Sequence, residues 1–238
     1  MRDKIKDSNY FNQYIKENTR VIEKYENMRI QLINERGADD PSIERVSLVL
    51  SNNYINRLNC FYSIGESLEE IKKVYHKAVK YLTIVWEKET SSYIQLLWLT
   101  SVGILLNEVR EVQSIQELVK KEQFADYLID YMLNNIDSQW EITTNNLAFP
   151  ETYNGIARVI KSENKEQALL FLKDYLEKEW YQGHKEADWY NAHKNKFDTY
   201  SGYWSYESGA IAKILNLDDS SLKDEPYYPY DLVHYSRS

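Results

Sequence analysis

The chain has 238 residues, 43% of them hydrophobic and 28% charged, which is enough for one sizeable folded domain or two smaller ones that share a core. Its 37 Asp and Glu against 29 Lys and Arg give a net charge of −8, and no basic stripe is present that could neutralise nucleic-acid phosphates. The single cysteine, Cys60, excludes an intramolecular disulfide and fits a reducing compartment. Because only 7 Gly and 4 Pro occur, turns are sparse and the composition favours an all-helical protein.

Local signals predict five helices in the first half of the chain. The first begins near Ser8 and ends at Gly37, and the second begins at the cap formed by Asp40 and Pro41 and ends at Gly65. The later starts are marked by serines, namely Ser67 with Glu70 for the third helix, Ser91 or Ser92 for the fourth, and Ser114 with Glu117 for a fifth that continues through Leu128 and Met132.

The fourth of these helices, over residues 93–106, is apolar nearly all round and is predicted to be central. It is short and is interrupted by Gln95, Thr100 and Ser101, so we expect it to be buried in protein and not in a membrane. The amino-terminal segment lacks the apolar core of a signal peptide. These features predict a cytoplasmic protein with no membrane partner.

The helical periodicity breaks at NNIDSQWEITTNNLAFPE, residues 134–151. We therefore predict an amino-terminal helical domain over 1–136 and a smaller carboxy-terminal helical domain over 150–238. The second domain begins with a short helix over residues 153–160 and a longer one over residues 165–180. The fold class is all-α, a compact bundle of roughly eight to ten helices in which the two domains pack together.

The composition changes from Trp180 onward. The last 59 residues contain 13 of the 33 aromatic residues, about double the density of the remainder. Residues 198–238 hold seven acids and three bases, so half of the net charge of −8 lies there. Aromatic residues combined with an acidic excess are typical of a recognition surface for a basic protein.

Several strings resemble a known family. EWYQGHKEADWYNAHK (179–194), YSGYWSYESGAIAKILNLDDSSL (200–222) and YYPYDL (227–232) are similar to the carboxy-terminal domain of PoNi proteins, the immunity partners of PoNe-type DNase toxins. Residues 42–79 and 93–106 are similar to the helical amino-terminal domain of that family. The most specific residues form two patterns, Gly202, Tyr203, Trp204, Glu207 and Ala210 in the first, and Tyr227, Tyr228, Pro229 and Asp231 in the second.

The resemblance spans roughly residues 5–235 and implies an all-helical protein that is not an enzyme. It implies that the protein binds one cognate PoNe-type DNase toxin and neutralises it by covering its DNA-binding or active-site surface. It implies no cofactor, and a protein partner in place of nucleic acid.

The runner-up hypothesis is a metal-dependent hydrolase built on His184, Asp188 and His193, because two histidines and a carboxylate can bind Zn or Fe. Their spacing fits a metal motif poorly, since His184 and His193 lie on nearly opposite faces of a helix. Cys60 follows an apolar helical pattern and no nucleophile motif occurs, so catalysis is not expected. A third hypothesis is a general helical scaffold with no toxin.

Glu207 follows Trp204 by three positions and precedes Ile211 by four, which places it on the inward face of a helix. We interpret it as a buried carboxylate that organises an aromatic corner, with a general base or a toxin contact as the alternative. The other residues assigned to this structural motif are Trp180, Trp189, Tyr203, Trp204, Tyr227, Tyr228 and Pro229.

Four acids lie around the end of the following helix and the next loop, where we expect them to be exposed. They are the predicted partner-binding residues, Asp218, Asp219, Asp224 and Glu225.

Overall fold

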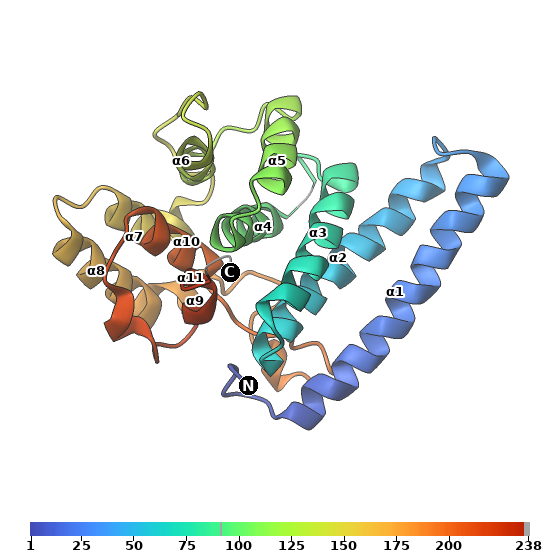
Figure 1. The fold of residues 1–238 in the computed structure, drawn as a ribbon, viewed down its shortest axis with the longest axis horizontal. Helices are drawn as coiled ribbons and strands as arrows, with labels where there is room; N and C mark the ends of the chain where they lie inside the picture. The colour runs from blue at the N-terminus through green and yellow to red at the C-terminus, as the bar shows by residue number, and fades with distance from the viewer. Residues whose placement is uncertain (91, 236–238) are drawn as a thin grey trace. The chain divides into compact units, whose positions relative to one another are not determined.

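The computed structural model describes residues 1–90 and 92–235, and within these ranges it is all-helical, with no β-strand. The all-α prediction is therefore confirmed (Figure 1). The helices are α1 (Ser8–Arg36), α2 (Pro41–Ile64), α3 (Leu68–Val85), α4 (Tyr93–Leu106), α5 (Val109–Lys121), α6 (Tyr127–Ile136), α7 (Pro150–Ile160), α8 (Lys165–Asp174), α9 (Trp180–Gly183), α10 (Tyr206–Ile214) and α11 (Tyr230–Val233). None of the described helices is long and apolar enough to cross a membrane.

The chain forms two compact units. Unit 1 contains Met1–Gln95 and Asn191–Gly202, and unit 2 contains Leu96–Tyr190 and Tyr203–Ser238. The units differ from the sequence ranges 1–136 and 150–238 because unit 2 begins at Leu96 and because the chain returns to unit 1 at Asn191. Whether those two sequence ranges are domains stays a prediction.

Unit 1 is built on long helices whose ends match the sequence signals. Asp40 caps α2 by accepting a hydrogen bond from the Ser42 amide at 2.8 Å, and Gly65 closes α2 in the left-handed conformation, with φ of 98°. Ser67 caps α3 by accepting from the Glu70 amide at 3.2 Å. The predicted starts of α1, α2 and α3 and the predicted ends of α1 and α2 are confirmed. Of the two predicted starts for α4, Ser92 directly precedes the helix and Ser91 lies outside the described residues.

The late segment of unit 1 is held to α1 and α2 by tyrosine and serine hydroxyls. The Tyr10 hydroxyl donates to the Tyr200 carbonyl at 2.9 Å and accepts from the Tyr200 amide at 3.0 Å. The Ser63 hydroxyl donates to the Ser201 carbonyl at 3.0 Å, and the Tyr200 hydroxyl donates to the buried carboxylate of Asp3. These contacts tie residues between 138 and 197 positions apart in the sequence, which local sequence patterns do not reveal.

Unit 2 consists of shorter helices joined by irregular segments. Residues 96–106 of α4 are buried on all sides, as the continuous apolar run predicts. The predicted helix over 165–180 contains a π-helical turn, η1 (Tyr175–Glu179), between α8 and α9. Two short 3₁₀ segments, η2 (Ala192–Lys194) in unit 1 and η3 (Asp219–Leu222) in unit 2, complete the helical elements.

One helix prediction in this region is wrong. Ser114 does not begin a helix, because it lies inside α5, where its hydroxyl bonds to the Arg110 carbonyl at 3.3 Å. The chain also does not continue as one helix through Met132. Gln123 has a positive φ of 49°, and Asp126 caps the separate helix α6 by accepting from the Ile129 amide at 2.9 Å.

Candidate functional site

Unit 2 contains an aromatic cluster, which we define as Trp98, Trp180, Tyr181, Trp189, Tyr203 and Tyr227. Trp180 is fully buried and its ring centroid lies 5.5 Å from that of Trp189 and 4.7 Å from that of Tyr227. Tyr227 stacks on Tyr181 with an interplanar angle of 7°. These contacts join helix α9 to the segment before α11, so the aromatic residues hold together parts of the chain that lack long helices.

The backbone around the two sequence patterns is irregular. Tyr227 has a φ of 67°, which is unusual for a residue with a side chain, and its carbonyl accepts from the Ser205 amide at 2.8 Å. Gly209 on α10 is packed closely, because an added Cβ would lie 2.7 Å from Cγ of Pro229. Tyr203 and Trp204 are both buried, 4% and 8% exposed.

Glu207, at the start of α10, is completely buried. Its Oε1 atom accepts hydrogen bonds from Trp180 Nε1 at 2.6 Å and from Ser205 Oγ at 2.8 Å, and Tyr175 OH lies at 3.5 Å. Its Oε2 atom has no hydrogen-bond partner among the described residues. Burial raises the pKa of Glu207 to about 7, although these hydrogen bonds work to lower it.

His184 is buried beside the cluster and uses both ring nitrogens. Nδ1 lies 2.6 Å from the Trp180 carbonyl, which can only accept, so Nδ1 carries the proton. Nε2, at 3.0 Å from the Tyr153 hydroxyl, therefore accepts a hydrogen bond from that hydroxyl. Burial lowers the pKa of His184 to about 4, so the ring is neutral and is fully occupied by hydrogen bonds.

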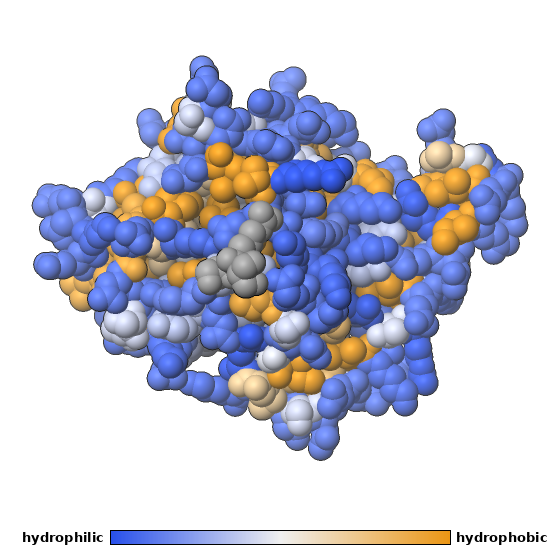
Figure 2. Space-filling model, in the orientation of Figure 1, coloured by the Kyte–Doolittle hydropathy of each residue, from blue (hydrophilic) through white to orange (hydrophobic). Residues whose placement is uncertain are grey.

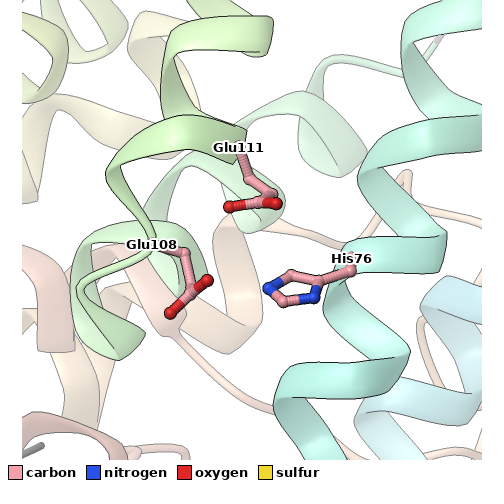
Figure 3. Close-up of side chains that lie close together, drawn as sticks. All are labelled: His76, Glu108 and Glu111. Carbon is pink, nitrogen blue, oxygen red and sulfur yellow. The ribbon is translucent and has the colours of Figure 1, made fainter.

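These bonds leave no nitrogen of His184 for a metal, so the hydrolase hypothesis loses its first ligand. Asp188 is exposed in unit 2, and His193 belongs to unit 1. Figure 3 labels other potential ligands, with His76 on α3 of unit 1 and with Glu108 and Glu111 at the start of α5 in unit 2. Within either unit taken alone, the described residues place no three His, Cys, Asp or Glu side chains at metal-binding distance from one another.

The four predicted partner-binding acids differ in exposure. Asp218 and Asp224 are exposed. Asp219 is only 4% exposed, which corrects the expectation that it faces solvent. Its carboxylate accepts from the Tyr228 hydroxyl at 2.5 Å and lies 3.2 Å from His234 Nε2, so it contacts the chain on both sides of α11.

Glu225 is also less available than expected. Its side chain is 15% exposed and lies 3.0 Å from Lys173 Nζ on α8. Of the four acids, Asp218 and Asp224 are therefore exposed, whereas contacts within unit 2 withdraw Asp219 and Glu225 from solvent.

The net negative charge of the chain comes from unit 2. Unit 1 has 17 Lys and Arg against 15 Asp and Glu, whereas unit 2 has 12 against 22. The acidic excess of the chain therefore belongs to the unit that also holds the aromatic cluster. Figure 2 shows hydrophilic residues over most of the visible face, with hydrophobic patches between them.

Comparison with protein families identifies the chain. Its residues 2–120 match the family described as PoNe immunity protein (PoNi), N-terminal, and residues 124–232 match PoNe immunity proteins (PoNi), C-terminal. The two matches follow each other along an all-helical chain, and both are to immunity proteins. The chain belongs to the PoNe immunity protein (PoNi) family, and the resemblance seen in the sequence is confirmed.

A solved structure shares the fold. The crystal structure of protein PA2201 from Pseudomonas aeruginosa matches with a TM-score of 0.65 and 16% sequence identity, over 92% of this chain and 87% of that chain. The search of curated proteins found no match. At this identity the structural match supports the fold and carries no information about ligands.

Proposed function

We propose that this protein binds a cognate PoNe-type DNase toxin and neutralises it by covering the DNA-binding or active-site surface of the toxin. The observation that carries this proposal is the match to the PoNi family over residues 2–120 and 124–232. Inhibition by covering a surface requires no catalytic group, and we expect the complex to form in the cytoplasm of the cell that makes both proteins.

The charge of unit 2 supports this partner. A DNase must present basic residues to DNA phosphates. Unit 2 has 22 acids against 12 bases, so it offers the complementary charge, which accelerates association and selects against acidic partners. Within unit 2 we propose Asp218 and Asp224 as toxin contacts because both carboxylates are exposed.

Inhibition of the toxin tests the proposal directly. The purified protein should abolish DNA cleavage by the cognate toxin at a 1:1 ratio, and co-expression should protect cells from the toxin. A toxin that cleaves DNA at the same rate with and without a molar excess of the protein would refute the proposed function. Competition by a DNA duplex for the catalytically inactive toxin distinguishes direct covering of the DNA site from an indirect block.

The role of the two exposed acids is tested separately by association kinetics. The Asp218→Asn/Asp224→Asn variant should associate with inactive toxin more slowly than the wild type at low salt, and the difference should shrink as salt rises. A matched control is Glu23→Gln/Asp39→Asn, which removes the same charge from exposed positions of unit 1. Equal on-rates for the two variants would remove Asp218 and Asp224 from the interface.

A further inference from the structure

A long irregular loop joins α6 to α7 in unit 2. The α6–α7 loop, residues 137–149, has 13 residues and no helix or strand (Figure 1). Loops of this length in compact proteins are uncommon, and they are usually either functional or disordered. This one is ordered by specific hydrogen bonds from its neighbouring helix, so disorder does not account for its length.

The first anchor is Asp130, which is 1% exposed on α6. Its Oδ1 accepts from Trp140 Nε1 at 3.0 Å, and its Oδ2 accepts from the Thr143 amide at 2.9 Å and the Thr143 hydroxyl at 2.8 Å. The Asn134 side-chain amide donates to the Trp140 carbonyl at 2.7 Å. One buried carboxylate therefore fixes the first half of the loop.

The second anchor is Asp126, which is fully buried at the start of α6. Its Oδ1 caps α6, and its Oδ2 accepts from the Ala148 amide at 2.8 Å. The Tyr127 amide donates to the Asn146 carbonyl at 2.9 Å. The second half of the loop is thus held by the first turn of the same helix, and both halves are fixed before any partner binds.

The fixed loop presents apolar side chains to solvent. Ile142 is 42% exposed and Phe149 is 49% exposed, although both are large hydrophobic residues. Glu141 and Glu151 are exposed beside them in the sequence. An exposed aromatic side chain on a rigid element is the kind of group that dominates binding energy at protein interfaces.

The loop also lies in a stretch without positive charge. No Lys or Arg occurs between Lys121 and Arg158, while this stretch contains six acids. Two lysines outside this stretch contact aromatic rings within it. Lys120 Nζ lies 5.0 Å from the ring centroid of Trp140 on the loop, and Lys161 Nζ lies 4.8 Å from that of Tyr127 on α6. This stretch bears two exposed carboxylates, that of Glu141 on the loop and that of Glu151 in the first turn of α7.

We propose that the α6–α7 loop, together with the first turn of α7, is a contact surface for the basic toxin. Ile142 and Phe149 are its apolar contacts, and Glu141 and Glu151 are its charged ones. This inference rests on the proposed function and adds a surface to it. A basic nuclease face fits the loop because it offers cations to the two acids and aliphatic lysine and arginine stems to the apolar side chains. Because Asp126 and Asp130 already order the loop, binding loses little conformational entropy.

The test compares variants in binding to the catalytically inactive cognate toxin by surface plasmon resonance. Ile142→Ala/Phe149→Ala should weaken affinity by about tenfold or more, chiefly through faster dissociation. The cap of α7 survives this change, because it uses the Phe149 carbonyl and not its side chain. The matched control is Leu170→Ala on α8, which removes an apolar side chain that is 66% exposed in the same unit. It should change affinity by less than about twofold.

A charge arm uses Glu141→Lys against the control Glu163→Lys, another exposed acid of unit 2. Glu141→Lys should slow association several-fold at low salt, since a like charge then faces the toxin, and Glu163→Lys should not.

The outcomes separate this inference from the proposed function. If the wild-type protein inhibits the toxin but the Ile142→Ala/Phe149→Ala variant binds within about twofold of it, the loop is not a contact and the proposed function stands. The same conclusion follows if Leu170→Ala weakens binding equally. If the wild-type protein neither binds nor inhibits the toxin, both proposals fall.

The anchoring of the loop gives an independent readout. Asp130→Asn should speed hydrogen exchange at the Thr143 amide and weaken toxin binding, because the loop must then be ordered during binding. Faster exchange at Thr143 with wild-type affinity would show that a fixed loop is not needed and would overturn the proposed role.

Discussion

In unit 1, Glu26 accepts from the Tyr54 hydroxyl at 2.7 Å and pairs with Lys77 at 3.0 Å, with its side chain 31% exposed. In unit 2, Glu207 accepts only from neutral groups and has no contact with solvent. Burial raises the carboxyl pKa at both sites, but at Glu26 the hydrogen bonds from Tyr54 and Lys77 outweigh it, and the pKa is lowered. At Glu207 burial prevails and the pKa rises to about 7. The sign of the shift therefore follows from complete burial among neutral donors at Glu207, and from partial exposure with bonds from Tyr54 and Lys77 at Glu26.

The two units also differ in how many of their acids are buried. The buried acids of unit 2 are Glu108, Asp126, Asp130, Glu207 and Asp219, whereas Asp3 is the buried acid among the described residues of unit 1. Unit 1 joins long helices through apolar faces, while unit 2 uses buried carboxylates to fix short helices and irregular segments. Even without these five acids, unit 2 has 17 acids against 12 bases, so its surface remains acidic.

The largest expected effect is the loss of Trp180 in unit 2. Trp180→Ala removes a fully buried ring and leaves Glu207 without its indole donor, so it should lower the free energy of unfolding by about 3–5 kcal/mol. Trp180→Phe, the control, keeps most of the ring and loses only the donor, so its cost should be smaller. Urea denaturation measures both. A Trp180→Ala variant as stable as the wild type would show that the aromatic cluster does not hold unit 2 together.

The second prediction concerns pH. Because the pKa of Glu207 is raised in the folded state to about 7, the folded protein binds this proton more tightly than the unfolded chain does. Its contribution to stability is therefore fully present below the unfolded value of about 4.3 and is lost as pH rises through 7.

The stability of the wild type relative to Glu207→Gln should accordingly fall between pH 5 and pH 8, by an amount on the order of 3 kcal/mol. The lowered pKa of His184 makes stability depend on pH in the opposite direction. The contribution of this neutral buried histidine to folding stability is lost as pH falls from 6.5 towards about 4. Both proteins contain His184, so its effect cancels in the difference. A difference that stays constant with pH would mean that Glu207 does not titrate in this range.

The comparison of units also explains what the sequence could predict. The starts of α1, α2 and α3 and the ends of α1 and α2 depend on residues within one turn, such as Asp40 with Pro41 and Gly65. These starts and ends were predicted correctly. Ser114 with Glu117 has the same spacing as the correctly predicted cap of α3, Ser67 with Glu70. Ser114 nevertheless lies inside α5, because the surrounding buried residues of that helix outweigh a capping signal.

The candidate site was less accessible to sequence analysis. Asp219 and Asp218 are adjacent and chemically identical, yet one is buried because Tyr228 and His234 meet it in the folded chain. Asp126 and Asp130 were both missed. For Asp126 a signal exists, because an aspartate before an apolar helical run is a cap signal, whereas Asp130 lies inside α6. Exposure of a charged residue is decided by distant residues, which a single sequence does not place.

A smaller effect is expected at Gly155 on α7. An alanine there would normally favour the helix by about 1 kcal/mol. Its Cβ would instead overlap the buried ring of Tyr175 and the Glu179 carboxylate on the π-helical turn η1, so Gly155→Ala should destabilise unit 2 by about 1–3 kcal/mol. Asn154→Ala, at the exposed neighbouring position, is the control and should be neutral or slightly stabilising. Equal melting temperatures for the two variants would refute close packing of α7 on η1.

The smallest predicted effect is that of Glu26, whose contribution to stability should depend on pH in the opposite direction to that of Glu207. Because the pKa of Glu26 is lowered in the folded state, its contribution to stability is present above the ordinary carboxyl value of about 4.3 and is lost as pH falls through the lowered one. Glu26→Gln should therefore cost below about 1 kcal/mol at pH 7, as expected for a partly exposed pair, and less at acid pH. The control is Glu23→Gln, which removes an exposed acid from the same helix. If Glu26→Gln and Glu207→Gln responded to pH with the same sign, burial and hydrogen bonding would not shift the pKa values of the two carboxyls in opposite directions.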